Sequence, residues 1–378
     1  MRITLFSLLF FILNNLTAQT IQVSLFNSRN VNAYTLSVRH GKYLIKGNDE
    51  IMGEYKKNSI FFINRIGDKI EIRDKNAQIG VFKEVTISPR DENSVVALRG
   101  VNPTTPSREY TDELTFTASG GKLKAINNVD LEKYISAVIE AEGGAYAPLE
   151  YYKAQGILVR TYTIKSIYKH AEEGFNLCDE VHCQAYHGRS AHNPEIYKAT
   201  KATAGLVLVD IADTVMAMTP FHSSCGGHTS PAGIYWQKDL PYLKGIEDPF
   251  CTESRNAYWE KTIPTKEWNQ FLRSKGVSNL SQFQHFHSEE RVQYFSQAHN
   301  IKMRDIRTAF KLKSTFFNVE PIENGVVIKG KGYGHGIGMC QLGAMEMARV
   351  GLTYMDILHF YFQNVLITDY SEMDLTRY

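Results

Sequence analysis

The sequence has little excess charge and few cysteines. Its 378 residues contain 42 Lys and Arg against 40 Asp and Glu, which leaves a formal net charge of +2. This small excess argues against a nucleic acid as the partner, because binding to a phosphate backbone depends on many cations. The five cysteines are too few for a disulfide scaffold, and their odd number means that at least one is unpaired within the chain.

A long hydrophobic run is also missing. The most apolar stretch, Ile3–Leu13, has about 11 residues and is too short to span a bilayer as a permanent helix. Arg2 precedes it and the small residue Ala18 follows it, which is the pattern of a secretory signal. We therefore predict that residues 1–18 are a signal peptide and that the protein is exported to the periplasm or cell surface. A buried first strand or helix is the alternative.

Short apolar runs dominate the next part of the chain. Ile21–Phe26 alternates apolar and polar residues, as a half-buried strand does. Similar runs at 43–45, 59–63, 69–72 and 95–98 are separated by Gly, Asp and Asn. No long helical pattern interrupts them, so we predict a β-rich N-terminal part over residues 19–127.

Helical periodicity begins after residue 128. Asp130 can cap a helix whose apolar residues recur at helical spacing and which ends at Gly143 and Gly144. Pro148 then opens a second helix. We predict an α+β fold, in which residues 128–378 form a mixed helix and strand part, either separate from the β-rich part or continuous with it.

Two glutamates, Glu140 and Glu142, fall at the end of the first predicted helix. A carboxylate there meets the negative end of the helix dipole, which is mildly unfavourable. The glycines that follow allow another segment to approach closely, and desolvation would favour the protonated carboxyl that a general acid needs. From these residues alone, a solvated surface glutamate remains the alternative.

The segments 134–142 and 148–162 resemble the core motif of the sporulation stage II protein D (SpoIID) family. The motif's glutamate falls on Glu142, eight residues after Tyr134. Six positions of the following helix match the family's motif directly: Lys153, Ala154, Gln155, Arg160, Thr161 and Tyr162. The sequence departs from the motif at Gly143, where Met is usual, and at Gly156, where Ala is usual.

Two further blocks extend the resemblance. Residues 221–229 are similar to the family's Ser-x-x-Gly-Gly-x-Thr turn, and residues 330–344 to its Gly-His-Gly-x-Gly-Met-x-Gln-x-Gly-Ala segment. The blocks occur in the family's order, and the resemblance runs from about residue 20 to residue 365. Three separated motifs in one order are a specific signal.

The resemblance implies a lytic transglycosylase of bacterial peptidoglycan. Such an enzyme cuts the MurNAc–GlcNAc bond of glycan strands, with peptide-free strands as one candidate substrate, and leaves 1,6-anhydro ends. Glu142 would be the single acid and base. The residues expected to bind substrate are Arg160, Ser223, Thr229, His335 and Gln341. The alternative is a non-catalytic glycan-binding protein that enhances a cell-wall amidase, which would then be its partner.

A compact group of metal-binding residue types follows the second predicted helix. Cys178, His182 and Cys183 lie within six residues, and His170 or His187 can supply a fourth ligand. Thiolate and imidazole are good zinc ligands, and a closed site of four is structural rather than catalytic. We expect structural zinc here; a Cys178–Cys183 disulfide is the alternative. A catalytic metal of a peptidase is disfavoured, since no His-Glu-x-x-His motif is present.

The other three cysteines fall in or near the family blocks. Cys225 and Cys251 flank segments that the family places near each other, so the resemblance implies a Cys225–Cys251 disulfide. Cys340, beside Met339, is then the odd thiol and is expected to be buried.

Overall fold

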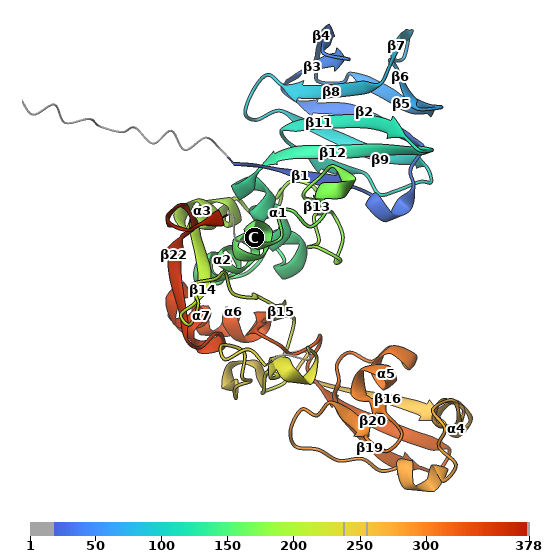
Figure 1. Ribbon diagram of the computed structural model, residues 1–378, viewed down its shortest axis with the longest axis vertical. Coiled ribbons are helices and arrows are strands. Elements are labelled where there is room, and N and C mark those ends of the chain that lie inside the picture. Colours follow the sequence, from blue (N-terminus) through green and yellow to red (C-terminus); the bar gives the residue numbers. More distant parts are fainter. Residues whose placement is uncertain (1–18, 237–238, 255, 376–378) are drawn as a thin grey trace, which may run out of the picture. The chain divides into compact units, whose positions relative to one another are not determined.

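The computed structural model describes residues 19–236, 239–254 and 256–375 (Figure 1). The predicted signal peptide, residues 1–18, lies outside these ranges. Two compact units divide the chain between Tyr134 and Ile135, within the first helix, whereas we predicted a boundary at residue 127. No helix in the described ranges is long and apolar enough to cross a membrane.

The first unit consists of two antiparallel sheets packed face to face (Figure 1). The order of one is β1-β12-β11-β8-β3-β4, and that of the other is β10-β9-β2-β5-β6-β7. The strands are β1 (Thr20–Leu25), β2 (Ala33–His40), β3 (Lys42–Gly47), β4 (Glu50–Lys56), β5 (Ile60–Ile66), β6 (Lys69–Arg73), β7 (Gln78–Phe82), β8 (Glu84–Pro89), β9 (Val95–Asn102), β10 (Arg108–Tyr110), β11 (Glu113–Ser119) and β12 (Lys122–Asp130).

The strand pattern follows from alternating side chains. In β11, Leu114, Phe116 and Ala118 are buried and the residues between them are partly exposed, so one face packs inward. The predicted strand at 21–26 is confirmed as β1, where Ile21 and Val23 are fully buried. The burial of apolar side chains between the two sheets stabilises the unit.

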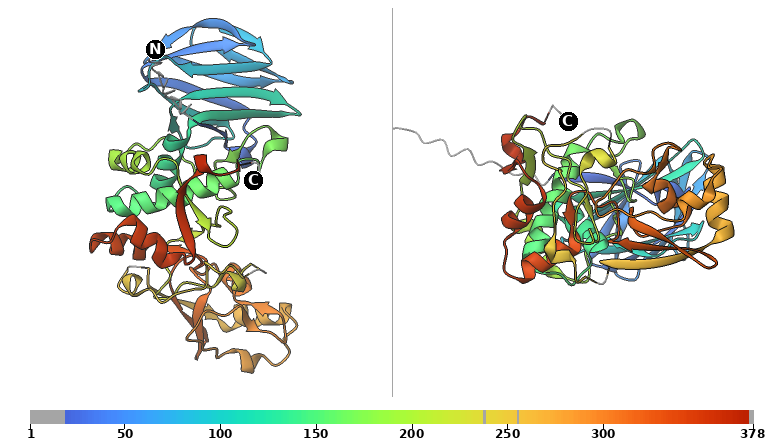
Figure 2. Two further views of the ribbon diagram at one scale, coloured as in Figure 1. Left: turned by 60° about the vertical axis from the view of Figure 1, so that its left-hand side comes forward. Right: turned by 90° about the horizontal axis from the view of Figure 1, so that it is seen from below.

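Helices form the main body of the second unit (Figure 2). They are α1 (Leu131–Gly143), α2 (Leu149–Lys165), α3 (Pro194–Ala202), α6 (Gln341–Arg349) and α7 (Tyr354–Tyr361). Short strand pairs connect distant parts of the chain: β14 (Leu206–Asp210) with β22 (Val365–Asp369), antiparallel, and β15 (Phe221–His222) with β21 (Met339–Cys340), parallel. The strand β13 (Leu177–Cys178) follows α2. The α+β class is confirmed.

A small α/β module is inserted in this unit between residues 258 and 331. Its strands β16 (Tyr258–Pro264), β20 (Gly325–Lys331) and β19 (Phe316–Ile322) form an antiparallel sheet in that order. The remaining elements are α4 (Thr265–Ser274), β17 (Tyr294–Ser296), β18 (Ile301–Lys302) and α5 (Met303–Ala309). The module has its own core around the buried Trp268, and the sequence analysis did not anticipate it.

Candidate functional site

Glu142 lies in the last turn of α1 and is partly buried. Its Oε1 accepts a hydrogen bond of 3.1 Å from the backbone N–H of Ala185. Its Oε2 makes no hydrogen bond with any residue that the structure describes. One oxygen is therefore fixed by the loop that follows Cys183, and the other is available to a ligand.

The neighbouring Glu140 is engaged differently. Its carboxylate accepts hydrogen bonds from Ser190 Oγ (2.8 Å), from the N–H groups of Ala191 and His192 (3.1 Å each), and from the His192 ring (2.7 Å). Burial alone would raise the pKa of Glu140, but these donors outweigh it and lower the pKa. Glu140 thus anchors the loop 190–192 as a carboxylate.

Gln341 contacts Glu142 from the other side. Its side-chain amide donates to the Glu142 carbonyl oxygen (3.3 Å) and to the Tyr151 hydroxyl (3.4 Å). A Cβ at Gly143 would lie 2.3 Å from that hydroxyl, so the chain has room only for glycine directly after Glu142. Gln341 is a positioning residue for the end of α1.

The two later family blocks meet beside Gln341. Strands β15 and β21 pair in parallel, and the Leu342 N–H donates to the Ser223 carbonyl (3.1 Å). Gly226 and Gly332 adopt positive φ angles of 70° and 73°, and a Cβ on Gly226 would lie 2.5 Å from the Gly332 nitrogen. Ser223 is partly exposed, in keeping with its predicted contact to substrate. The three motif blocks therefore converge on the end of α1.

His335 lies partly buried in the glycine-rich segment. Its Nδ1 accepts a 3.0 Å hydrogen bond from the Ile337 N–H, and its ring centroid is 5.4 Å from that of His222. Burial, with a smaller effect of Arg307 and Arg291, lowers the pKa of His335 to about 4. The ring is therefore neutral near pH 7.

Two residues predicted to bind substrate have structural positions instead. Arg160 is fully buried, and its guanidinium donates to the carbonyls of Leu206 (3.0 Å) and Thr200 (3.1 Å). Thr229 is 3% exposed, and its Oγ1 accepts the Ile246 N–H (2.8 Å). Both side chains join segments of the fold, because buried donors and acceptors must be paired internally. Their positions do not support the predicted contacts to substrate.

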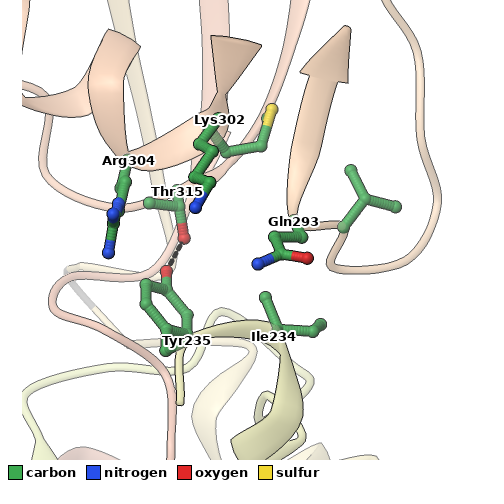
Figure 3. Close-up of a pocket in the computed structure, with 8 residues that line it drawn as sticks. Ile234, Tyr235, Gln293, Lys302, Arg304 and Thr315 are labelled. Atoms are coloured by element: carbon green, nitrogen blue, oxygen red, sulfur yellow. Dashed lines mark hydrogen bonds between the residues drawn. The ribbon is translucent and has the colours of Figure 1, made fainter. Parts of the chain in front are cut away.

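The second unit has a groove of about 660 Å³, and Glu142 is not among the residues that line it. It is lined by the loop after α1, the segment 249–254 and the outer face of α6. Tyr146, in the loop after α1, lines the groove and is 97% exposed. Leu342, which also lines it, directly follows Gln341 in the sequence. A second hollow, around Tyr235 and Thr315 (Figure 3), measures about 10 Å³ and has room for no more than one water. Of these two hollows, only the groove is large enough for a sugar chain.

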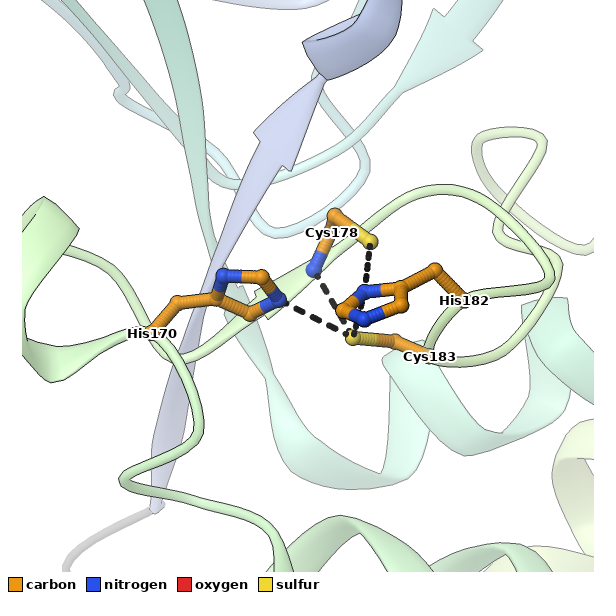
Figure 4. Close-up of side chains that lie close together, drawn as sticks. All are labelled: His170, Cys178, His182 and Cys183. Atoms are coloured by element: carbon orange, nitrogen blue, oxygen red, sulfur yellow. Dashed lines mark hydrogen bonds between the residues drawn. The ribbon is translucent and has the colours of Figure 1, made fainter.

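His170, Cys178, His182 and Cys183 point toward one another (Figure 4). Their ligand atoms all lie within 4.8 Å of each other, with Cys183 Sγ 3.4 Å from His170 Nε2 and Cys178 Sγ 3.7 Å from His182 Nδ1. The other nitrogen of His170, Nδ1, is hydrogen-bonded to Glu173, an arrangement typical of a metal-binding histidine. Between the two candidates for fourth ligand, the structure brings His170 into the cluster and not His187.

All five cysteines carry free thiols in the structure. The resemblance implied a Cys225–Cys251 disulfide; in the structure both thiols are free, and Cys225 Sγ donates to an Asp248 carboxylate oxygen at 3.1 Å. The expectation that Cys340 is buried is confirmed.

Sequence reasoning missed the partners that fix Glu142. Ala185 acts through its backbone N–H, which no side-chain pattern reveals. Tyr151 cannot be distinguished by sequence from any other aromatic residue of the core. The one available signal was Gly143, since a glycine in place of a large residue marks a close approach.

Comparison with known proteins agrees with this arrangement. A family model described as Stage II sporulation protein matches residues 119–209, which include Glu142, α2 and the Cys/His cluster. Stage II sporulation protein D of Bacillus subtilis is 28% identical over 273 residues, covering 68% of this chain and 79% of the relative. An uncharacterized protein of Brachyspira hyodysenteriae is 28% identical over 353 residues, which cover 90% of this chain and 91% of the relative.

A further relative is the protein named Amidase enhancer of Bacillus subtilis. It is 28% identical over 293 residues, which cover 62% of this chain and 40% of the relative. The matches and the three convergent blocks define a protein with a role related to the cell wall. The match over residues 119–209 and the two Stage II sporulation protein D relatives support the resemblance of this chain to the SpoIID family.

Proposed function

We propose that this protein is an exported lytic transglycosylase of peptidoglycan in which Glu142 is the catalytic acid and base. The observation that carries the proposal is the pair of unlike glutamates at the end of α1. Glu140 has four hydrogen-bond donors, whereas Glu142 is partly exposed and has one oxygen without a partner among the described residues.

Of the two glutamates at the end of α1, only Glu142 has an oxygen without a partner among the described residues, and one available carboxylate there favours transglycosylation over hydrolysis. A hydrolase of glycosides usually needs two carboxyl groups, one to protonate the leaving group and one to act on water or on the sugar. With Glu140 bound to its loop, Glu142 would serve both steps of a reaction that consumes no water.

The reaction would proceed in two proton transfers. The Glu142 carboxyl protonates the glycosidic oxygen, the C1–O bond of MurNAc breaks, and the GlcNAc hydroxyl leaves. The Glu142 carboxylate then takes the proton of the 6-hydroxyl of the same MurNAc, whose oxygen bonds to C1. The acid is regenerated, and the product carries a 1,6-anhydro ring.

Several side chains would place the strand. The exposed Tyr146 offers an aromatic face to a sugar at the mouth of the groove, and the partly exposed Ser223 offers a hydroxyl. Because Nδ1 of the neutral His335 accepts the Ile337 N–H, its Nε2–H is the group that could donate to a sugar oxygen. Hydroxyl contacts suit a chain with almost no net charge.

Structural zinc would be held by His170, Cys178, His182 and Cys183, a donor set that fits its tetrahedral preference. When bound, zinc would supply a crosslink with no open coordination position. Cys183 lies two residues before Ala185, whose N–H contacts Glu142. These four residues therefore fix the loop that orients the proposed acid.

The test is digestion of purified glycan strands, with and without stem peptides, followed by mass spectrometry of the products. Glu142→Gln should reduce the release of anhydro ends by at least about 10²-fold, because the acid is lost while the shape is kept. Glu195→Gln is the control, since Glu195 is an exposed carboxylate on α3 paired only with Lys198. Equal activity of both variants would reject Glu142 as the catalyst.

The name of the Amidase enhancer relative supports a second candidate, a glycan-binding partner of a cell-wall amidase. That function predicts strand binding without new anhydro ends and a faster amidase in a mixed assay. Stimulation that persists in Glu142→Gln, with no cleavage by the wild type, would favour it over the lytic enzyme.

A further inference from the structure

A second cluster of metal-binding side chains lies in the same unit. The thiols of Cys225, Cys251 and Cys340 and a carboxylate oxygen of Asp248 all lie within 4.8 Å of one another. The four side chains are fully buried, with exposures that round to 0%. They come from the turn at 224–227, the short 3-10 helix Pro249–Cys251 and the start of α6.

The surroundings supply donors to the sulfur atoms. Cys340 Sγ lies 3.2 Å from the Cys225 N–H and 3.4 Å from the Gly343 N–H. Cys251 Sγ lies 3.1 Å from Ser224 Oγ. Backbone N–H groups directed at sulfur favour the thiolate, the form that binds metal.

Asp248 is held in a fixed orientation. Its Oδ2 accepts the Tyr361 hydroxyl at 2.8 Å, and its Oδ1 accepts the Phe250 N–H at 3.0 Å. A Cβ at Gly343 would lie 2.4 Å from Asp248 Oδ2, so only glycine leaves room for this carboxylate. Its partners, a phenol, an amide and a thiol, are all neutral donors, and buried carboxylates are normally paired with a cation or bound to a metal.

We propose that Cys225, Asp248, Cys251 and Cys340 bind a second zinc ion in a closed structural site. Three sulfurs and one carboxylate oxygen within 4.8 Å of one another match the number and type of ligands of tetrahedral zinc. Three thiolates and a carboxylate exceed the charge of Zn²⁺ by two. The buried guanidinium of Arg291, which donates to the Cys225 carbonyl at 2.6 Å, offsets part of that excess.

A disulfide is a poorer solution for these residues. A Cys225–Cys251 bond would remove the thiol that now donates to Asp248, and it would leave that carboxylate and Cys340 together in the core. Zinc instead takes all four groups, and so leaves no buried thiolate or carboxylate without a partner.

The second site would act on the proposed acid through a different segment from the first cluster. Cys340 directly precedes Gln341, whose amide donates to the Glu142 carbonyl. The first cluster reaches Glu142 through Ala185. Two structural ions would thus fix the two segments that contact the end of α1.

Metal analysis of the full-length mature chain, expressed with added Zn²⁺ and purified without chelator, tests the site. We expect two zinc ions per chain. Asp248→Asn, which keeps the shape of the side chain, should weaken binding at this site by at least about tenfold. Cys178→Ser with Cys183→Ser is the matched control and should remove only the other ion.

Cobalt gives a readout independent of activity. In the Cys178→Ser, Cys183→Ser variant, Co²⁺ should still give intense thiolate-to-metal absorption and tetrahedral visible bands, and both should fall in Cys340→Ser. After unfolding without reductant, Cys225, Cys251 and Cys340 should all be alkylated as free thiols. A Cys225–Cys251 disulfide in non-reducing peptide mapping, or loss of all zinc in the Cys178→Ser, Cys183→Ser variant, would overturn the proposal.

Discussion

Replacement of Gly143 or Gly156 by alanine should change the stability of the protein in opposite directions. Both glycines stand where the SpoIID family motif has a larger residue. In α1, a Cβ on Gly143 would lie 2.3 Å from the Tyr151 hydroxyl, and Tyr151 is fully buried. In α2, a Cβ on Gly156 would meet its nearest atoms at 3.6–3.7 Å, which is ordinary contact. Gly143→Ala should therefore destabilise the protein, whereas Gly156→Ala should not.

The magnitudes follow from packing. Overpacking of a core costs about 1–3 kcal/mol, and replacing glycine by alanine inside a helix contributes about 0.5–1 kcal/mol. Gly143 is the last residue of α1, where that gain is small, so Gly143→Ala should cost about 1–2 kcal/mol. Gly156→Ala has no clash to offset and should stabilise by about 0.5–1 kcal/mol.

Tyr151→Phe tests the cause of the clash. It removes the hydroxyl and its 3.4 Å bond from Gln341, at a cost of about 1 kcal/mol. With the hydroxyl gone, the nearest ring atoms to the new Cβ lie at 3.1 and 3.2 Å, which needs only a small shift. The double variant should therefore be about 1 kcal/mol more stable than the sum of the single effects.

The assay is chemical unfolding of five proteins, the wild type, Gly143→Ala, Tyr151→Phe, their double variant and Gly156→Ala, followed by far-ultraviolet circular dichroism. Additivity of Gly143→Ala and Tyr151→Phe to within about 0.3–0.5 kcal/mol would refute the clash. A loss of stability in Gly156→Ala equal to that in Gly143→Ala would refute the contrast between the two helices.

Two further predictions concern residues of the family blocks. Arg160→Lys should lower the free energy of unfolding by about 2 kcal/mol or more, because one ammonium cannot reproduce two hydrogen bonds to buried carbonyls. It should leave KM of the folded enzyme unchanged. Chemical unfolding measures the first effect and strand digestion the second. For His335, burial holds the native pKa at about 4, whereas the unfolded chain takes up a proton below about pH 6.5. Stability should therefore fall as pH drops from about 6.5 to about 4, and His335→Gln should reduce this fall; an identical pH profile of the variant would contradict the argument.

Local pattern was enough to predict much of the fold. Alternation located strands such as β1, and the cap Asp130 with the glycines after Glu142 located α1, because these elements bury one face each. The inserted module was not predicted, since its sheet pairs β16 with β20 across more than 60 residues and local periodicity carries no information on such pairing.

The site was predictable only in part, because a motif match does not state where a side chain points. The interior of α2 is buried on nearly every side, so Arg160 lies in the core although it matches the family motif. Gln341 contacts the end of α1 through its side-chain amide, and Ser223 is joined to α6 by the Leu342 N–H; their contacts to substrate stay predictions.

The cysteines show the same limit. Cys178, His182 and Cys183 are neighbours in the chain, and their spacing was sufficient to suggest a cluster. Cys225 and Cys340 are separated by 115 residues, and Asp248 lies between them in sequence, so the second cluster appears only when the chain is folded.

The most direct test of the central claim is digestion of peptide-free glycan strands in water enriched in the heavy oxygen isotope. A single-carboxylate transglycosylase uses the 6-hydroxyl of the sugar, so new ends should be anhydro sugars that carry no heavy oxygen, and Glu142→Gln should form none. New reducing ends that carry the heavy isotope would show attack by water and would contradict the account.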